Sequence, residues 1–476
     1  MYMYLQRRFI SRFLLPVLLS GACTTVFSQS SFDGHLLIAD SMPHKFVPGL
    51  GRTSHGTKNF ARSALYLGIA EATPFVFDRY IMNKDYAKIS FQSIGNNLKL
   101  SSWAWDDDGF QTNQFGHPYH GSLFFNAFRV NGYSFWQSAA ATVTGSYIWE
   151  TFAENQAPSP NDFINTSFGG IVLGEMTYRL ANRIVNNQQT GFKKQAGEVL
   201  GFLLNPMNGL KRITTRQWGK TNPDTSYKDE SEIVAELELG IRKFRTINDH
   251  IANRKTGPYG RIKLFYGNPH ENYKTPFSNM YINAEFGQDD SSKVNMINVY
   301  GSLTGWQLKS TRLVHHLAIL SANYDFIYNN AFFYGAQSLK LNLFSEYSLQ
   351  KRSRLNTALG LGPVLLAAVP DSYGFNGRNY NYTMGLGLQA GGSLNFRDRL
   401  FLGADYRVNW LKTINGNISH YYLHVLRTEM RYAITQQFSI CVESGYFNLF
   451  GRYDQYKDVV REYPFSRIST RYSIRL

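Results

Sequence analysis

The sequence predicts an α+β chain in which a small helical domain is followed by a transmembrane antiparallel β-barrel of about twelve strands. Three observations carry this prediction: an export signal, helical spacing of apolar residues in the first half, and strict alternation of apolar and polar residues in the second. The expected order is a signal peptide at 1–28, an extension at 29–57, the helical domain at 58–215, a linker at 216–231 and the barrel at 232–476.

The N-terminus has the order of a secretory signal. Three arginines stand among the first twelve residues, a short apolar run follows, and cleavage is expected after Ser28. Lipidation of Cys23 is an alternative, but Ser20 stands where a lipobox has a large aliphatic residue. Cleavage after Ser28 leaves Cys441 as the only cysteine, which excludes an intramolecular disulfide and a thiolate metal cluster.

Composition narrows the class of protein further. The hydrophobic fraction is 43%, and no run of about 18 apolar residues occurs, which argues against a polytopic helical membrane protein. Aromatic residues make up 15% of the chain, as is typical of barrels that place them at both membrane interfaces. The net charge of +15 is spread along strands without a basic arm, so outer-membrane lipid and a small solute or lipid are the expected partners, and nucleic acid is not.

The barrel prediction depends on alternation with a period of two. In the last ten residues one face carries mostly apolar and aromatic side chains, and the other carries arginine and serine. Twelve such segments are expected, at 233–244, 260–267, 279–287, 294–308, 313–328, 332–348, 354–367, 382–396, 399–411, 421–434, 437–450 and 465–476. Bulges would change the count to ten or fourteen, and turns are expected at 288–292, 371–374 and 415–417.

A soluble β-sandwich or a lipocalin-like barrel is the alternative architecture. Its outer face would be charged, whereas here the charges gather on one face of each strand, which favours lipid as the neighbour of the other face. The charged side chains expected to face the lumen include Asp405, Arg407, Arg427, Glu429 and Arg431.

The first half predicts a compact helical bundle on the periplasmic side of the barrel. Helices are expected at 59–81, where Pro74 introduces a kink, and at 118–131, 134–155 and 159–186. Small residues spaced four apart, such as Gly170 and Gly174, allow two helices to pack closely.

These helices contain the candidate catalytic residues, which are His117, His120, Glu150, Glu154 and Asp162. The two histidines stand three apart and the two glutamates four apart, so each pair shares a helix face. Histidine with carboxylates suits a general acid–base pair or a divalent metal site. The identity of any cofactor or metal stays open.

A structural interpretation of the same residues is favoured by spacing alone. His117 fits a helix N-cap before Pro118. Ser159 also fits an N-cap, with Asp162 at the third helical position. The two glutamates would then form a solvated helix face.

The motifs HPYHG, WETFAEN, PSPNDFINTSFGG and GEMTYRL together resemble an uncharacterised family of bacterial outer-membrane proteins of the Bacteroidetes type. The resemblance covers about residues 95–215, including the segment NPMNG at 205–209. It implies an outer-membrane location and a helical domain joined to a C-terminal barrel, and it brings no established activity. A fainter likeness exists to small envelope domains with a helical His…Glu…Asp-x-x-x-Asn pattern.

Three function hypotheses follow. In the first, the protein has a binding, transport or envelope-maintenance role at the outer membrane, with the helical domain docked to the barrel or partly plugging it. A twelve-stranded barrel is intermediate in width, so a narrow or plugged lumen is expected, in which the charges select solutes or fill the interior.

The second hypothesis is an envelope enzyme that acts on lipid or glycan. His120 would be the general base or a metal ligand, Glu154 or Glu150 its partner, and Asp162 would orient it. No Gly-x-Ser-x-Gly, Walker or His-Glu-x-x-His motif supports the common hydrolase, nucleotide or zinc-protease mechanisms. The third hypothesis is a purely structural barrel that supports envelope assembly.

Overall fold

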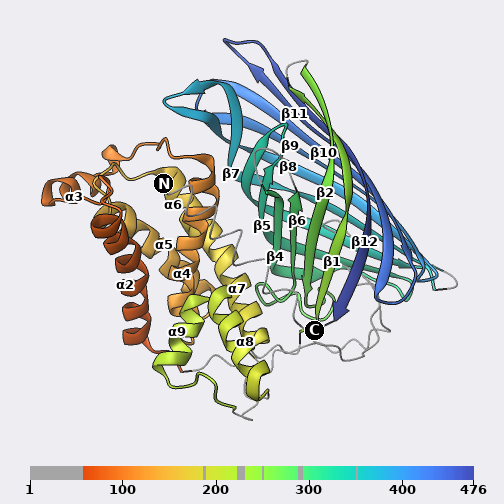
Figure 1. Cartoon of the computed structure of the whole chain (residues 1–476), viewed down its shortest axis with the longest axis horizontal. Helices are drawn as coiled ribbons and strands as arrows, with labels where there is room; N and C mark the ends of the chain where they lie inside the picture. The colour runs from red at the N-terminus through yellow and green to blue at the C-terminus, as the bar shows by residue number, and fades with distance from the viewer. Residues whose placement is uncertain are drawn as a thin grey trace.

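The computed structural model describes residues 57–185, 189–221, 231–248, 251–287, 293–349 and 352–475. In these residues a helical domain stands beside a closed antiparallel barrel of twelve strands (Figure 1). The signal peptide, Cys23, most of the expected linker and the turn at 288–292 lie outside the described residues. Within the described part, none of the helices combines the length and the apolar character needed to cross a membrane.

The helical domain contains the four helices expected from the sequence and several more. Its elements are α2 (Phe60–Val76), η2 (Phe77–Ile81), α3 (Phe91–Asn97), η3 (Leu100–Ser102), η4 (Thr112–Gly116), α4 (His117–Arg129), α5 (Phe135–Phe152), α6 (Pro160–Ile164), η5 (Asn165–Gly169), α7 (Gly170–Ile184), α8 (Gly191–Leu204) and α9 (Pro206–Thr214). Local chemistry explains the starts of two expected helices. Ser134 begins α5 with a capping box, and Ser159 begins α6 with its side chain accepting from the Asp162 N–H.

The expectation that His117 caps a helix is wrong. The chain is already helical from Phe110, and both Gly116 and His117 have right-handed helical backbone angles. Pro118 lacks an N–H, so a carbonyl one turn earlier has no donor within the helix. The hydroxyl of Tyr324 on the barrel donates to the Gln114 carbonyl and satisfies it. Pro118 therefore stands in the first turn of α4, at a contact with the barrel, and Gly116 rather than His117 precedes that helix.

Two facing glycines set the closest approach within the bundle. Gly121 of α4 lies against Gly170 of α7, and a Cβ added at Gly121 would stand 1.8 Å from the Thr166 carbonyl oxygen. A Cβ added at Gly170 would stand 2.5 Å from the Gly121 carbonyl carbon. The two helices therefore pack backbone to backbone, as expected for stretches rich in small residues.

The barrel is made of consecutive antiparallel neighbours and closes by pairing β1 with β12. The strands are β1 (Ile233–Asn248), β2 (Ile251–Tyr266), β3 (Met280–Gly287), β4 (Val294–Gln307), β5 (Val314–Tyr328), β6 (Phe333–Ser348), β7 (Arg354–Phe375), β8 (Arg378–Phe396), β9 (Leu400–Asn415), β10 (Ser419–Ala433), β11 (Phe438–Tyr453) and β12 (Val459–Arg475). The expected number of strands is confirmed.

Several strands are longer than the sequence predicts, and one expected turn is wrong. Residues 371–374 lie inside β7, where the register with β8 shifts between Pro370 and Phe375. The chain turns instead at Asn376 and Gly377, whose φ angles are 47° and 84°. Two consecutive positive φ angles suit a tight hairpin and favour Asn-Gly there. The turn expected at 415–417 is confirmed.

The faces assigned from the alternation are confirmed on the last strand. Arg467 and Arg471 are buried in the barrel, whereas Ile468 and Tyr472 are 56% and 42% exposed on the outside. Because a register error of one residue would exchange the two faces, this pattern shows that the strand is correctly aligned.

The side chains of the barrel fill its interior in three layers. An apolar layer lies at the end where β1 begins, and it includes Phe265, Tyr281 and Phe344. A second apolar layer, which includes Tyr421 and Phe447, lies toward the opposite end. The middle layer consists of ion pairs between buried groups, such as Arg261 Nη2 to Glu443 Oε2 at 2.7 Å, Arg467 Nη2 to Glu443 Oε1 at 2.6 Å and Arg471 Nη2 to Glu429 Oε1 at 2.5 Å.

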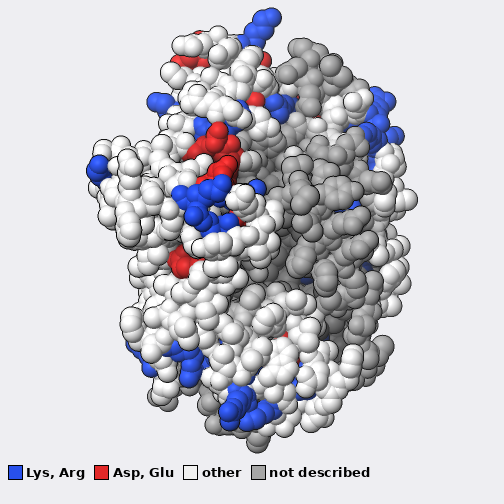
Figure 2. Space-filling view, turned by 60° about the vertical axis from the view of Figure 1, so that its left-hand side comes forward, with Lys and Arg blue, Asp and Glu red and all other residues white. Residues whose placement is uncertain are grey.

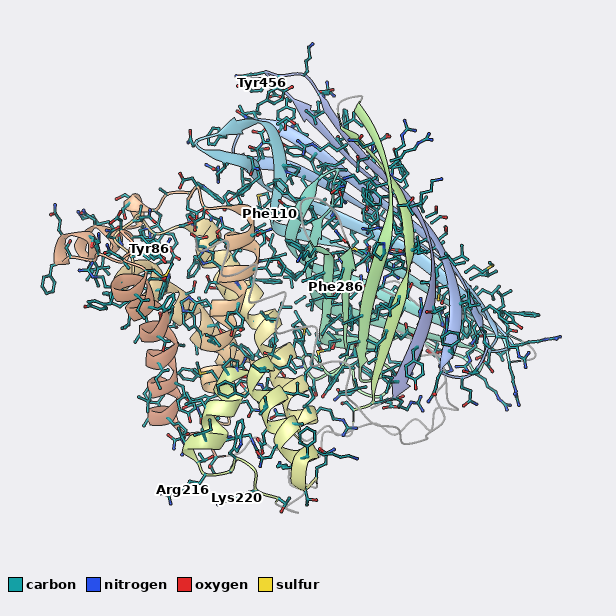
Figure 3. The ribbon with its side chains drawn as sticks, viewed as in Figure 1. Tyr86, Phe110, Arg216, Lys220, Phe286 and Tyr456 are labelled. Carbon is teal, nitrogen blue, oxygen red and sulfur yellow. The ribbon has the colours of Figure 1, made fainter. Side chains whose placement is uncertain are left out.

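The helical domain packs on the outer wall of the barrel. One apolar cluster joins residues of α5 and α7 to outward-facing residues of β3 to β8, among them Ala322, Phe326 and Tyr382. Phe110 lies between the two parts of the molecule, with its ring centroid 4.5 Å from that of Phe333 (Figure 3). The alternative in which this domain plugs the barrel is therefore wrong.

Candidate functional site

Four of the five candidate residues, His117, Glu150, Glu154 and Asp162, lie near one another close to where the helical domain touches the barrel wall. The loop between η3 and η4 runs along this junction. The Trp105 ring lies 5.0 Å from that of Tyr382 on β8, and the Tyr380 hydroxyl donates to the Asp108 carbonyl at 2.7 Å. The barrel thus holds the backbone of the loop in place.

His117 and Asp162 form the centre of the site. His117 Nε2 lies 3.0 Å from Asp162 Oδ1, and both side chains are largely buried. His117 comes from the first turn of α4 and Asp162 from the first turn of α6. Asn161 also donates to Asp162 Oδ1, at 2.9 Å. The carboxylate is thus fixed by an ion pair and a side-chain amide.

Asp106 is the neighbour of this pair and receives donors from both parts of the molecule. Its Oδ1 accepts from Asn161 Nδ2 at 2.7 Å, from Asn113 Nδ2 at 3.3 Å and from the Tyr382 hydroxyl at 3.2 Å. The first two donors belong to the helical domain and the third to the barrel. The position of Asp106 therefore depends on the docking of the two parts.

The expectation that Glu150 and Glu154 form a solvated helix face is wrong. Glu150 is buried, and Glu154 is half-buried. Glu150 is 1% exposed and accepts from the backbone N–H of Ser159 at 2.9 Å. Glu154 is half-buried and accepts from the indole N–H of Trp149 at 2.7 Å. Both carboxylates therefore face into the domain because α5 packs against α6 and the loop that precedes it.

His120 lies apart from the cluster. Its Nε2 is 3.2 Å from the Ala70 carbonyl oxygen, and its ring packs 4.4 Å from those of Phe124 and Trp149. Burial lowers the pKa of His120 to about 4, so it is neutral. This environment suits a structural side chain better than a general base.

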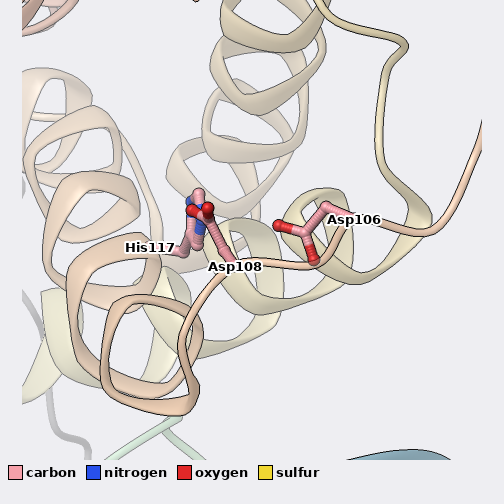
Figure 4. A group of neighbouring side chains, drawn as sticks. All are labelled: Asp106, Asp108 and His117. Carbon is pink, nitrogen blue, oxygen red and sulfur yellow. The ribbon is translucent and has the colours of Figure 1, made fainter. Parts of the chain in front are cut away.

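Three side chains in the site are of the types that bind metal ions and lie near one another. One ligand atom each from Asp106, Asp108 and His117 lie within 4.8 Å of one another (Figure 4). Asp108 is exposed, and the other two residues are partly buried. The sequence Trp-Ala-Trp-Asp-Asp-Asp-Gly contains two of these ligands, but its function was not evident from spacing alone.

Electrostatics in the cluster are dominated by carboxylates. Burial opposes the charge on His117, but the Asp162 carboxylate outweighs it and raises the pKa of His117 to about 10. The protonated His117 in turn holds the pKa of Asp162 below its usual value despite burial. Burial and the nearby Asp162 charge raise the pKa of Asp106 to about 8 and that of Glu154 to about 7. Burial and the Glu154 charge raise the pKa of Glu150 as well.

Stability of the helical domain is expected to fall as the pH rises from about 4.5 to 8. Burial raises the pKa of Glu71 to about 8 in the folded protein. Between pH 4.5 and 8 its carboxyl group is therefore ionised in the unfolded state but still protonated in the folded state, and this difference favours unfolding. Glu71→Gln should remove this loss of folding free energy, which is at most about 5 kcal/mol. The melting temperature should therefore rise more at pH 8 than at pH 5. Thermal melts followed by tryptophan fluorescence test this, with the exposed Asp85→Asn as control. Equal gains at both pH values would contradict it.

Comparison with known proteins finds one family whose model matches the part of the chain that contains the site. The family described as Domain of unknown function (DUF3943) matches residues 102–207, which include every residue of the cluster that belongs to the helical domain. No curated protein matches the chain.

Solved structures similar to this chain include outer-membrane porins. The NanC porin is 10% identical, with 49% of this chain and 98% of that chain covered and a TM-score of 0.28. The KdgM porin is 14% identical, with 49% and 99% covered and a TM-score of 0.24. The outer membrane channel DcaP of Acinetobacter baumannii is 8% identical, with 52% and 99% covered and a TM-score of 0.27.

Proposed function

We propose that this chain is an outer-membrane β-barrel protein with a binding role in the envelope, and that its binding site is the His117–Asp162 cluster. The supporting observation is the contrast between the two parts of the molecule. The barrel interior is filled by its own side chains, while the cluster lies outside the barrel and reaches the surface at Asp108.

The membrane location is supported by the outer face of the barrel. Large apolar side chains stand exposed there, including Leu402, Met430 and Ile440 at 41%, 48% and 40%. Charged side chains in the middle of the same strands, such as Arg407, Glu429 and Glu443, are buried in the barrel interior, which is the arrangement of a barrel surrounded by lipid. The end at which β1 begins and β12 ends, next to α8, is proposed to face the periplasm (Figure 1).

The helical domain also presents an apolar surface. On the face seen in Figure 2 the described surface is largely uncharged, with acidic and basic side chains gathered in patches. Leu65, Tyr80, Ile81, Phe91 and Trp136 are each more than half exposed. Such a surface favours contact with membrane lipid, and therefore a ligand that is itself part of the envelope.

A pore is not expected to open through this barrel. The middle layer of ion pairs and the two apolar layers leave the charges of the lumen paired with one another rather than free to select solutes. Purified protein in planar lipid bilayers should therefore show no stepwise conductance of the kind that porins give. Stable single-channel steps at neutral pH would contradict the closed interior and would favour a transport role over a binding role.

Complementation of a deletion strain tests the role of the cluster. His117→Gln keeps a donor toward Asp162, so the domain should fold, but the charge of the pair is lost. We expect this variant to assemble in the outer membrane and to reproduce the envelope lipid composition of the deletion strain. His424→Ala on β10, where the ring contacts the Tyr406 hydroxyl, is the matched control and should complement fully. Full complementation by His117→Gln would reject the site.

An envelope enzyme is the second candidate function. It is favoured by the 3.0 Å contact between His117 Nε2 and Asp162 Oδ1, because a carboxylate that orients an imidazole is a common part of acid–base sites. In this proposal His117 replaces His120 as the acid–base residue; it is protonated at neutral pH and therefore acts as the general acid, and Asp162 orients it. Lipid or glycan species that accumulate in both the deletion and the His117→Gln strain would identify the substrate.

A further inference from the structure

We propose that Asp106, Asp108 and His117 bind a divalent cation at the junction between the helical domain and the barrel wall. This inference rests on the proposed function of the same cluster, to which it adds a cofactor. The donor set of one imidazole and two carboxylates is one that zinc or manganese accepts. Three protein ligands also leave a coordination position for water or for a ligand group.

Closing the site requires the three ligand atoms to move together. They lie within 4.8 Å of one another, whereas ligands about 2.1 Å from a tetrahedral metal are roughly 3.4 Å apart. Asp108 is exposed, so its carboxylate can turn without displacing a packed neighbour. Asp106 is already held by Asn161 and Tyr382. Two of the ligands are thus preorganised and the third closes the site.

The surroundings of the three ligands are those of a metal site. A histidine that binds a metal usually gives its second ring N–H to a carboxylate, which fixes the ring. Asp162 Oδ1 stands 3.0 Å from His117 Nε2 and would take that role where the other ring nitrogen binds the metal. The donors to Asp106 likewise orient a ligating carboxylate. These outer contacts come from α6 and from β8, so both parts of the molecule build the site.

Metal binding is tested directly on the full chain, purified in detergent without a histidine tag and stripped with EDTA. Calorimetric titration with Zn²⁺, and with Mn²⁺ followed by electron paramagnetic resonance, should show about one site per chain. Asp108→Asn should weaken binding of the better ion by roughly tenfold or more. Asp107→Asn is the matched control, because it removes a carboxylate from the same loop that lies outside the three-residue group.

The outcomes separate this proposal from the function of the cluster. Absence of stoichiometric binding, or equal affinity in Asp108→Asn and the wild type, would overturn the metal site. Thermal melts of both variants without metal show whether a loss of binding merely reflects unfolding, and His117→Gln then serves as a second ligand variant. If His117→Gln fails to complement while the wild type binds neither ion, the cluster functions without a metal and only the present inference falls.

Discussion

Replacement of Gly121 by alanine is expected to unfold the helical domain while the barrel stays closed. The new methyl group would stand 1.8 Å from the Thr166 carbonyl oxygen, which is backbone and cannot rotate away. Helices α4 and α7 must then separate, which costs about 3 kcal/mol or more. The cluster would be lost with them, because His117 lies on α4 and Asp162 lies on the helix that leads into α7.

Limited proteolysis and heat-modifiability in gels, run together, measure this result. The variant should lose protease protection in the helical domain but keep the folded barrel band. Gly68→Ala is the control, since nothing lies within 4 Å of its added Cβ, and it should be neutral or stabilise α2 by up to about 1 kcal/mol. A Gly121→Ala protein as protease-resistant as Gly68→Ala would show that the two helices do not cross so closely.

Arg261→Met is expected to destabilise the barrel by about 3–5 kcal/mol. Arg261 is fully buried and contacts Glu443 at 2.7 Å and both Glu238 and Glu285 at 3.5 Å. Methionine has a volume similar to that of arginine but carries no charge. The three buried carboxylates that contact Arg261 would then lose one of their cationic partners. Removing one partner from a buried ionic network is costly because the remaining charges stay desolvated.

Urea unfolding of the detergent-refolded protein gives the size of this effect through the shift of the midpoint. Arg452→Met is the matched control, because Arg452 stands exposed near the end of β11 and should change the midpoint little. A midpoint for Arg261→Met within error of that control would mean that the interior network contributes little. Water would then have to reach these carboxylates, which would weaken the case for a closed lumen.

The barrel could be predicted from sequence because two different environments act on alternate residues of each strand. On β12 the outward Ile468 and Tyr472 meet one environment, and the inward Arg467 and Arg471 meet another. The alternation fades toward the strand ends, beyond the band of exposed apolar side chains, where both faces of a strand carry polar residues. For this reason the first part of β12 was missed, whereas the tip of β7 was missed because residues 371–374 have the composition of a turn. Short helices such as α3 were missed because seven residues carry too little periodicity.

The candidate site was predictable in part. Residue chemistry alone brought together His117, Glu150 and Asp162, which do lie near one another. Helix spacing placed His120 beside His117. That argument fails because the two histidines contact different helices that pack around α4. His117 faces α6, whereas His120 faces α2 and α5. The role of Asp106 could not be found from sequence, since its donor Tyr382 belongs to a strand whose docking no local pattern encodes.

The hydroxyls of Tyr380 and Tyr382 make the cluster a point of reciprocal coupling between the two parts of the molecule. One donates to the backbone of Asp108 and the other to the side chain of Asp106, so the loop is held from the barrel side. Any ligand that draws these aspartates together also tightens the attachment of the helices to the wall. By thermodynamic linkage the reverse holds equally. A displacement of the helices along the barrel would alter the affinity of the proposed site by the same factor.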